Sequence, residues 1–426
     1  MPFFYDLGLA LYHVGIKAAA PIKPKAKAWI EGRRTVFGTL ELKRNRALRG
    51  CIWMHCASVG EFEQGRPVLE ALKARWPERP VLITFYSPSG YEACKEYAGA
   101  THVEYLPADG AKNASDFLDL VQPSLVLWVR YEFWYHWLHT LKQRSIPVFL
   151  VSGIFRPMHP FFRWYGGTHR RMLGFFTHLF VQDEASRDLL TTVGVTNVSV
   201  SGDTRFDRVM SIVQQAAEGH PNDPDYRTKM EMTVAAKARP MLVAGSTWPA
   251  DTSLIQEATK DPRRSVGLVI APHETPTDDE VMRLVRGTER SVVRWSNIVV
   301  ERYTPSADSL LLVDVNGYLS RMYAFADITY VGGGFGDGIH SLLEAAAWSK
   351  PVIFGPNHQK FAEARGLIDA GGGFEVRDAK GLAEVLDRLI NDPSARREAS
   401  EAAGRYVRER VGATERIVRA IVHAMA

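Results

Sequence analysis

The chain has 426 residues, enough for two or three domains that each have a hydrophobic core. With 46% hydrophobic and 23% charged residues, the composition excludes a disordered or fibrous protein. No apolar run reaches the length of about 18 residues that a membrane span requires, which argues against a multi-span membrane protein. Three cysteines cannot supply a disulfide framework, favour a reducing compartment and form no metal-binding cluster.

The basic residues are unevenly distributed along the sequence. The whole chain has 52 basic and 48 acidic residues, but the first 50 residues contain ten Lys or Arg against three acidic residues. A basic segment on a near-neutral body indicates an anionic neighbour, either lipid or nucleic acid. Nucleic acid is the weaker interpretation, because these basic residues are not interleaved with aromatic residues and match no nucleic-acid-binding fold.

The apolar segment that begins the sequence favours lipid. Residues 2–17 predict a helix in which Asp6, His13 and Lys17 form one narrow polar stripe and most of the remaining surface is apolar. An apolar helix followed by basic residues is typical of a segment that lies in the cytoplasmic face of an anionic membrane, so residues 1–50 predict such a contact. The alternative is a helix packed on the protein's own core, followed by a solvated basic loop.

The rest of the chain predicts an α/β fold with two domains. Short apolar runs such as CIWMHCAS, PVLITFYS and SLVLWV alternate with helical segments, which indicates parallel sheets covered on both faces. The expected divisions are a first Rossmann-like domain at 51–210, a polar connection at 211–240, and a second Rossmann-like domain with the C-terminal helices at 241–426. Two doubly wound domains facing across a cleft are expected to bind ligands where the carboxyl ends of their strands meet.

A glycine-rich motif marks the second domain. The sequence GGGFGDG at residues 332–338 lies between the strand ITYV and the helical run SLLEAAAW. A turn of this kind at the start of a helix can present free N–H groups to an anion, although its spacing fits neither a dinucleotide-binding nor a Walker motif. A purely structural turn remains open. Glu344, in the following helix, could accept hydrogen bonds from ribose hydroxyls or be a solvated carboxylate.

A carboxylate marks the first domain. Glu61 follows the strand CIWMHCA and Ser58, at the first turn from strand to helix. A carboxylate at the edge of a cleft can serve as a general base, whereas the alternative is a helix N-terminal carboxylate favoured by the helix dipole. His55 and Cys56 are adjacent on a predicted strand and point to opposite faces, so they are not expected to form a thiol–imidazole pair.

These motifs together resemble one family. The strings WMHCASVGE, TFYSPSGYE, VSGDTRFD and YVGGGFGDGIHSLLEAAAWSKPVIFGPNHQKF are similar to the 3-deoxy-D-manno-octulosonic acid (Kdo) transferases of lipopolysaccharide synthesis, over nearly the whole chain. The resemblance implies a GT-B glycosyltransferase that moves Kdo from CMP-Kdo to a lipid A precursor, lipid IVA, with inversion. It also implies a site without bound metal, and a location on the cytoplasmic face of the inner membrane.

The resemblance also assigns roles to individual residues. Glu61 matches the carboxylate that deprotonates the acceptor hydroxyl, and Glu132 and Arg205 match positions that support the transition state. With the glycine motif, the expected CMP-binding residues are Pro272, His273, Asn316, Gly317, Tyr318, Gly334, Gly336, Ser341, Leu342, Leu343 and Glu344. The chain departs from the usual family pattern at several of these positions, and it has Trp248 where a His is common.

Two other functions compete with this interpretation. Another GT-B enzyme, such as a sugar-nucleotide epimerase or a UDP-sugar transferase, would share the two domains and the acidic ribose contact. A non-catalytic, membrane-associated binding protein would use Glu61 only to stabilise a helix N-terminus. Preference for CMP over UDP distinguishes the first alternative, and the effect of Glu61→Gln on activity distinguishes the second.

Overall fold

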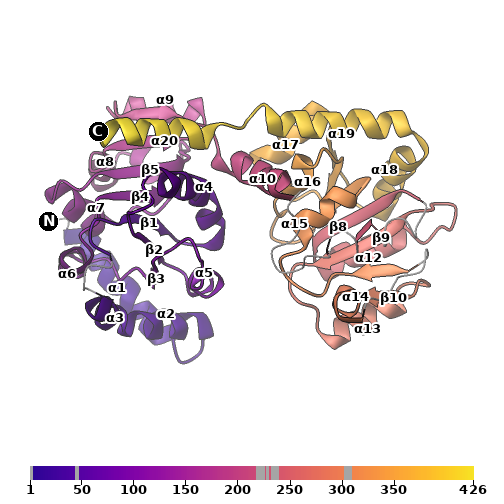
Figure 1. The fold of residues 1–426 in the computed structure, drawn as a ribbon, viewed down its shortest axis with the longest axis horizontal. Helices are drawn as coiled ribbons and strands as arrows, with labels where there is room; N and C mark the ends of the chain where they lie inside the picture. The colour runs from indigo at the N-terminus through magenta and orange to yellow at the C-terminus, as the bar shows by residue number, and fades with distance from the viewer. Residues whose placement is uncertain (1–2, 44–47, 217–225, 227–229, 232–238, 302–308) are drawn as a thin grey trace. The chain divides into compact units, whose positions relative to one another are not determined.

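The computed structural model describes residues 3–43, 48–216, 226, 230–231, 239–301 and 309–426. The chain divides into two compact units, which are described separately. The first consists of Met1–Arg208 together with Val411–Ala426, and the second of Val209–Arg410. Each unit contains one seven-stranded, entirely parallel sheet, shown in Figure 1.

The first unit has the strand order β3-β2-β1-β4-β5-β6-β7. Its strands consist mainly of apolar residues, and those of β1, β2, β4 and β5 are buried along their whole length, as the continuous apolar runs predict. The strands are β1 (Ile52–Cys56), β2 (Val81–Phe85), β3 (His102–Tyr105), β4 (Leu125–Val129), β5 (Val148–Gly153), β6 (His178–Val181) and β7 (Val198–Val200).

Helices connect these strands and cover both faces of the sheet, each of which has its own hydrophobic cluster. They are α4 (Val59–Arg75), α5 (Pro88–Cys94), α6 (Ala111–Val121), α7 (Tyr135–Gln143), the short η1 (Pro160–Phe162), α8 (Gly167–Leu173) and α9 (Glu184–Thr192). The helix α10 (Thr204–Gln215) follows the last strand, β7, and its residues are divided between the two units. The strand order reverses between β1 and β4. Ligands of doubly wound sheets bind at such a point, beyond the carboxyl ends of the strands.

The second unit has the strand order β10-β11-β9-β8-β12-β13-β14, which reverses between β8 and β12. The strands are β8 (Met241–Thr247), β9 (Gly267–Pro272), β10 (Val292–Arg294), β11 (Leu310–Leu312), β12 (Ile328–Val331), β13 (Val352–Phe354) and β14 (Gly373–Glu375). The helices are α12 (Pro249–Ala258), α13 (Asp278–Arg286), α14 (Trp295–Glu301), α15 (Leu319–Met322), η3 (Tyr323–Phe325), α16 (Leu343–Ala347), α17 (Ala362–Ala370), α18 (Ala379–Asn391) and α19 (Pro393–Arg408). Two doubly wound domains were expected, and each unit has this topology.

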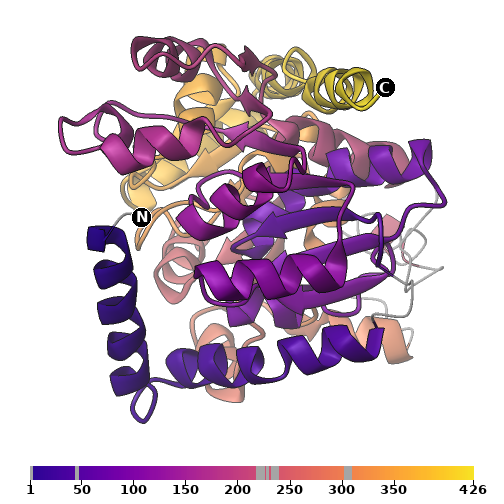
Figure 2. The same cartoon turned by 90° about the vertical axis from the view of Figure 1, so that its left-hand side faces the viewer.

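In the segment 1–50, the described residues 3–43 and 48–50 form three helices of the first unit: α1 (Phe3–Ala19), α2 (Pro24–Arg34) and α3 (Val36–Lys43). Figure 2 shows α1, in indigo, at the outer edge of this unit. Its polar side faces the unit, since Tyr5 donates to Asp109 at 2.7 Å and Asp6 lies 2.6 Å from a ring nitrogen of His136. Its apolar side is exposed, with Phe3, Phe4, Leu7, Leu11 and Val14 on the surface.

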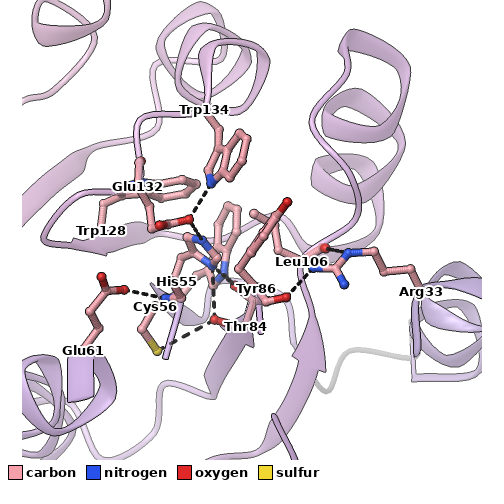
Figure 3. Close-up of polar contacts among 12 residues, drawn as sticks. Arg33, His55, Cys56, Glu61, Thr84, Tyr86, Leu106, Trp128, Glu132 and Trp134 are labelled. Atoms are coloured by element: carbon pink, nitrogen blue, oxygen red, sulfur yellow. Dashed lines mark hydrogen bonds and ion pairs between the residues drawn. The ribbon is translucent and has the colours of Figure 1, made fainter. Parts of the chain in front are cut away.

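No helix among the described residues combines the length and the hydrophobicity needed to cross a bilayer. One basic residue of the segment is also withdrawn from the surface. Arg33 donates to the carbonyls of Trp29, Tyr86 and Leu106 at 2.7–3.1 Å, and burial lowers its pKa to about 10. Arg33 therefore fastens α2 to the loops that follow β2 and β3 (Figure 3).

The last helix corrects the expected division of the chain. We expected the C-terminal helices to belong with the second domain, but α20 (Ala413–Ala424) belongs to the first unit. Its Ile417 and Ile421 are fully buried in the cluster behind α4. Asp207 accepts hydrogen bonds from the backbone N–H groups of Gly412 and Thr414 at 2.5 and 2.7 Å, which caps the helix.

The connection expected between the two domains at 211–240 also differs from the observed structure. The helix α10 continues to Gln215, so it crosses the boundary expected at residue 210. Most of the expected connection at 211–240 lies outside the described residues. The buried Tyr226 packs against Trp295 and Tyr318, with ring centroids 5.9 and 5.7 Å apart, so this part of the connection belongs to the core of the second unit.

We predict that Ile421→Ala destabilises the first unit by about 2–5 kcal/mol, because the substitution leaves a cavity in its core. Urea unfolding followed by circular dichroism measures this change. Arg419→Ala, on the exposed side of the same helix, is the control and should change the free energy of unfolding by less than about 0.5 kcal/mol. Equal effects of the two substitutions would show that α20 is not part of this core.

Candidate active site

Glu61 lies in the first turn of α4, directly beyond the end of β1. The Ser58 hydroxyl accepts the Glu61 N–H at 3.4 Å as the helix N-cap, and the Glu61 carboxylate accepts the Ala57 N–H at 2.5 Å. These contacts fix the carboxylate at the end of the strand, where it is only 8% exposed. This position is compatible with both interpretations made from the sequence, a general base and a helix N-terminal carboxylate. The electrostatic surroundings of Glu61 distinguish the two.

Glu132 lies in the loop that follows β4, the neighbouring strand across the reversal point. Its Oε2 accepts the indole N–H of Trp134 at 2.7 Å and lies 3.8 Å from Nε2 of His55 (Figure 3). The backbone carbonyl of Glu132 accepts the indole N–H of Trp128. Two tryptophans thus hold the loop and its carboxylate in place.

Burial and the charge of Glu132 together raise the pKa of Glu61 to about 7. Burial is the larger cause, because it removes water from the carboxylate. The Ala57 N–H and the charge of Arg130 act in the opposite direction and lower the pKa. A carboxylate that titrates near neutral pH can accept a proton during catalysis, whereas a helix N-terminus alone would lower its pKa.

A cavity of about 310 Å³ opens beside Glu132. It lies between the loop after β4 and the segment around η1, and most of its lining is aromatic. Flat aromatic faces and a carboxylate are suited to binding a sugar. The lining residues are Tyr131, Glu132, Phe133, Trp134, His159, Pro160, Phe161 and His169.

Arg205, the third residue expected on this side, lies at the start of α10. Its guanidinium pairs with Asp203 at 2.7 Å. The preceding Thr204 donates to the carbonyl of Gln64 in α4 at 2.6 Å, so α10 is joined to the helix that carries Glu61. The structure thus brings Glu61 and Glu132 together and attaches the Arg205 segment to the same helix.

In the second unit, Asp251 organises the loops at the reversal point. It is 1% exposed, accepts the Tyr330 hydroxyl at 2.7 Å, and accepts the N–H groups of Trp248 and Gly333 at 2.9 and 3.0 Å. This one carboxylate therefore joins the loops that follow β8 and β12.

Three aromatic rings stack at the carboxyl ends of β8, β9 and β12. The rings of His273 and His340 are 4.1 Å apart, and Trp248 lies 4.9 Å from His273. The Trp248 indole donates to Nε2 of His340 at 3.1 Å, and burial lowers the pKa of His340. A neutral His340 is thus part of a flat aromatic surface beside the expected donor site.

Several residues expected to bind the donor line one small cavity of about 110 Å³ beyond β8, β9 and β11. They are Pro272, His273, Asn316 and Gly317. Tyr318, expected with them, is instead buried, and its ring packs 5.7 Å from both Tyr226 and Trp295.

The glycine-rich turn differs from the expectation. The N–H groups of Gly333, Gly336, Gly338 and His340 donate to Asp251 or to carbonyls of the turn itself, at 3.0–3.3 Å, so they are not free for an anion. A Cβ on Gly334 would lie 2.6 Å from the backbone of Gly355, so the turn needs glycine there for close packing. The expectation of free N–H groups came from the position of the glycine-rich turn before a helix, which does not show the hydrogen bonds that Gly336 and its neighbours make within the turn.

The expected residues 341–344 lie at the start of α16. This helix begins at Leu343, so Glu344 lies in its first turn. Leu342 and Leu343 are buried, so only their backbone N–H groups could contact a ligand. Ser341 is exposed and Glu344 is half-buried.

Sequence reasoning missed three residues of the two sites. It set His55 aside as a catalytic thiol partner, without considering that it could contact Glu132. Asp251 and His340 were not considered. Pro249 at the start of a helix, with Asp251 in its first turn, was a detectable signal for Asp251. Among the described residues, no group of three potential metal ligands occurs.

Comparison with known proteins relates this geometry to a family. Residues 31–208 match the model of the family described as 3-deoxy-D-manno-octulosonic-acid transferase (kdotransferase). The 3-deoxy-D-manno-octulosonic acid transferase of Bordetella pertussis is 26% identical and covers 97% of this chain and 99% of its own length. This chain is a relative of the Kdo transferases.

A second relative is longer than this chain. The bifunctional glycosyltransferase/methyltransferase of Fusobacterium nucleatum is 23% identical over 81% of the chain, and the match spans 53% of its own length. The chain thus corresponds to about half of that protein. The resemblance to Kdo transferases expected from the sequence motifs is confirmed.

Solved structures confirm the fold. The UDP-GlcNAc 2-epimerase from Neisseria meningitidis bound to UDP-GlcNAc has a TM-score of 0.60 at 16% identity, covering 87% of this chain and 99% of that chain. MurG from Acinetobacter baumannii has a TM-score of 0.52 at 14% identity, with the same coverage of both chains. The Kdo transferase relative therefore has the GT-B fold, as expected.

We predict that Glu61→Gln stabilises the protein at alkaline pH. Folding raises the pKa of Glu61 from its ordinary 4.5 to about 7, so the folded chain retains a proton that the unfolded chain has lost. Stability therefore falls as pH rises from about 4.5 to about 7, by about 3 kcal/mol in total. Gln mimics the neutral acid and avoids this loss.

Urea unfolding at pH 5 and pH 8 measures the effect. The variant should exceed the parent by less than about 1 kcal/mol at pH 5 and by up to about 3 kcal/mol at pH 8. Equal stabilities at pH 8 would contradict the raised pKa. Glu92→Gln, at an exposed carboxylate of α5, serves as the control and should show no such difference.

Proposed function

We propose that the chain transfers Kdo from CMP-Kdo to a hydroxyl group of a lipid A precursor, with inversion at the anomeric carbon. The observation that carries the proposal is the buried carboxylate of Glu61, with a pKa of about 7, at the reversal point of the unit that matches the Kdo transferase family model. Such a group can remove a proton from a sugar alcohol as that oxygen attacks.

In the proposed reaction, the acceptor oxygen bonds to the anomeric carbon of Kdo on the face opposite CMP. Glu61 takes the hydroxyl proton, the bond between the anomeric carbon and the phosphate oxygen breaks, and CMP leaves with the electron pair. Glu132 stabilises the positive charge that develops on the sugar ring. Arg205 provides a guanidinium for negative charge, either on the leaving phosphate or on the Kdo carboxylate.

The donor is proposed to bind the second unit, in the cavity lined by Pro272, His273, Asn316 and Gly317 and against the ring stack of Trp248. No metal ion is required in this proposal. The leaving group is a nucleoside monophosphate, whose single phosphate can be stabilised by backbone N–H groups and a guanidinium.

We predict that the purified chain, incubated with CMP-Kdo and a tetraacyl lipid A precursor, yields products heavier by Kdo units in mass spectrometry. Glu61→Gln should reduce kcat by about 10²- to 10⁴-fold, since it removes the base, and leave CMP affinity unchanged. Glu92→Gln is the exposed control and should retain the parent rate. Full activity of Glu61→Gln would exclude the proposed role of this carboxylate.

The second candidate is another GT-B enzyme with a different sugar nucleotide. The specific observation in its favour is the fold shared with an epimerase solved with UDP-GlcNAc. Isothermal titration of CMP and UDP separates the candidates, because a UDP-sugar enzyme must bind a diphosphate. Tighter binding of UDP would refute Kdo transfer, whereas the proposal requires CMP to bind at least tenfold tighter.

The first unit also presents two exposed apolar elements that suit a membrane-embedded acceptor. One is the outward side of α1, where Phe4 is 85% exposed. The other is the loop around η1, where Trp164 is 91% exposed and stands with the exposed Met158 and Tyr165. Interfacial membrane segments combine such aromatic residues with basic ones, and Arg156 and Arg163 are exposed in the same loop.

Both elements border the segment that carries Glu132. The Tyr5 hydroxyl of α1 accepts the N–H of Tyr135 at 3.0 Å, and Phe161 of the loop packs on Phe133 with ring centroids 4.7 Å apart. A surface formed by these elements would hold the cavity beside Glu132 against a lipid headgroup. We therefore propose that this unit binds the cytoplasmic face of the inner membrane.

We predict that Trp164→Ala, and separately Leu11→Ser in α1, each weaken binding to vesicles with anionic lipid, roughly tenfold for the loss of one large apolar side chain. Co-sedimentation measures the binding. Met282→Ser removes an exposed apolar side chain from α13 of the second unit and is the control. If all three variants sediment like the parent, these elements are not the membrane contact.

A further inference from the structure

Arg130 is a charged residue at the edge of the sheet that carries Glu61 and Glu132, and the proposed reaction gives it no role. It directly follows β4, and its backbone N–H donates to the carbonyl of Val151 in β5 at 3.0 Å. Its φ angle of 64° lies in the left-handed region, which is uncommon for residues other than glycine and concentrates at ligand-binding positions. The sheet therefore holds the start of this side chain in a conformation that an arginine seldom adopts.

The strand register brings Arg130 close to Glu61. β1 and β4 pair in parallel, with His55 opposite Trp128. Two residues further along each strand, Arg130 is level with Ala57, whose N–H binds the Glu61 carboxylate at 2.5 Å. Burial is the main influence on the pKa of Glu61 and raises it, whereas the charge of Arg130 lowers it. The charge of Arg130 therefore acts on the carboxylate proposed as the base.

The guanidinium of Arg130 has no polar partner in the described part of the chain. Its Nε is buried and makes no hydrogen bond, and its terminal nitrogens make neither a hydrogen bond nor an ion pair with a described residue. Its central carbon lies 5.1 Å from the centre of the Tyr131 ring. A buried charged donor without a partner is costly, and arginine stays protonated in proteins. The residue is half-buried, so a ligand can still reach it.

The two arginines at the start of α10 are already paired with carboxylates. Arg205 donates from Nε and Nη2 to one oxygen of Asp203, at 2.8 and 2.7 Å. Arg208 pairs with Glu63 of α4 at 2.5 Å. At the same end of the sheet, Arg130 differs from both of them because its N–H groups remain available to a ligand.

The chemistry of the proposed donor supplies a matching anion. Kdo is a sugar acid whose carboxylate is bonded to the anomeric carbon, which is the atom that the acceptor oxygen attacks. This carboxylate must therefore lie next to the reacting atom, where ionised Glu61 and Glu132 would repel it. A planar guanidinium can donate two parallel hydrogen bonds to a carboxylate and offset that repulsion.

We propose that Arg130 binds the carboxylate of the donor sugar through its guanidinium N–H groups. The inference rests on the proposed function, which supplies the sugar acid. Of the two roles open to Arg205, the leaving phosphate then remains. The lipid acceptor also carries anionic oxygen groups, and the kinetic test below separates these two sources.

Arg130→Gln removes the guanidinium and keeps a polar side chain. We expect it to raise KM for CMP-Kdo and to lower kcat/KM roughly 10- to 100-fold, the value of hydrogen bonds to a charged group. The affinity for CMP, which lacks the carboxylate, and KM for the lipid acceptor should not change. Arg187→Gln, at an arginine of α9 that pairs with Glu184, is the control and should keep the parent values. A raised KM for the acceptor with an unchanged KM for CMP-Kdo would overturn the proposal.

The pH dependence separates substrate binding from a purely electrostatic effect on Glu61. Removing the positive charge raises the pKa of Glu61 further, so Arg130→Gln also moves the acidic limb of kcat/KM to higher pH. At pH 9 Glu61 is ionised in both proteins, and a purely electrostatic effect disappears. We expect the raised KM for CMP-Kdo to persist at pH 9. Parent values of KM and kcat/KM at pH 9 would overturn the proposal.

Nitrogen NMR tests the binding without reference to activity. In the full chain labelled with ¹⁵N-arginine, the Nε–H signal of Arg130 is identified by its absence in Arg130→Gln. This signal should shift when free Kdo is added, and should not shift with the methyl ester of Kdo, which lacks the negative charge. No shift with Kdo, or equal shifts with both compounds, would overturn the proposal. If the parent chain forms no Kdo product, the proposed function fails, but this spectrum still decides whether Arg130 binds the sugar acid.

Discussion

The proposed chemistry depends on the packing of two carboxylates at the place where the first sheet reverses its strand order. Glu61 follows β1 and Glu132 follows β4, and the parallel pairing of these strands sets the spacing of the two loops. A lone buried carboxylate would be costly, but the Ala57 N–H and Arg130 compensate part of that cost. The part of the burial and of the Glu132 charge that is not compensated raises the pKa of Glu61 to about 7, so the carboxyl group can exchange a proton at neutral pH.

The second sheet also reverses its strand order, but the buried carboxylate at that point makes different hydrogen bonds. There the buried carboxylate at the reversal point, Asp251, is saturated by the Tyr330 hydroxyl and two backbone N–H groups. It ties together the loops that follow β8 and β12, and beside those loops lie the expected donor cavity and the ring stack. One sheet thus ends in the carboxylate of the proposed base and the other in a carboxylate that holds loops together, and the two differ in how many hydrogen-bond donors each receives.

Much of this organisation could be predicted from the sequence. Continuous apolar runs identified the central strands, because a strand covered on both faces needs no polar side chain. Glu61 could be picked out by its place at the turn after the first strand, with a general base and a helix N-terminal carboxylate as open alternatives. The donor-side residues Pro272, His273, Asn316 and Gly317 came from the family resemblance, as did Glu132, which periodicity alone could not single out.

The errors have physical reasons. The sequence pattern does not show that α20 returns to the first unit, because the burial of Ile417 and Ile421 is a long-range contact. The helix α1 was expected to be apolar around most of its girth, yet its few polar groups bind His136 and Asp109 and turn its apolar side outward. In the glycine turn, the N–H groups of Gly336, Gly338 and His340 donate to carbonyls of the turn itself. His55 was judged by its neighbour along the strand, although its polar contacts are with residues of another strand and a loop.

The most direct test of the central claim is a titration of the Glu61 carboxyl group by ¹³C NMR in the full chain, with the signal assigned by its absence in Glu61→Gln. The account predicts a midpoint near pH 7 in the ligand-free protein. A midpoint near the ordinary value of 4.5 would contradict it, because a fully ionised, weakly basic Glu61 would be a helix N-terminal carboxylate and not a base tuned by burial and Glu132.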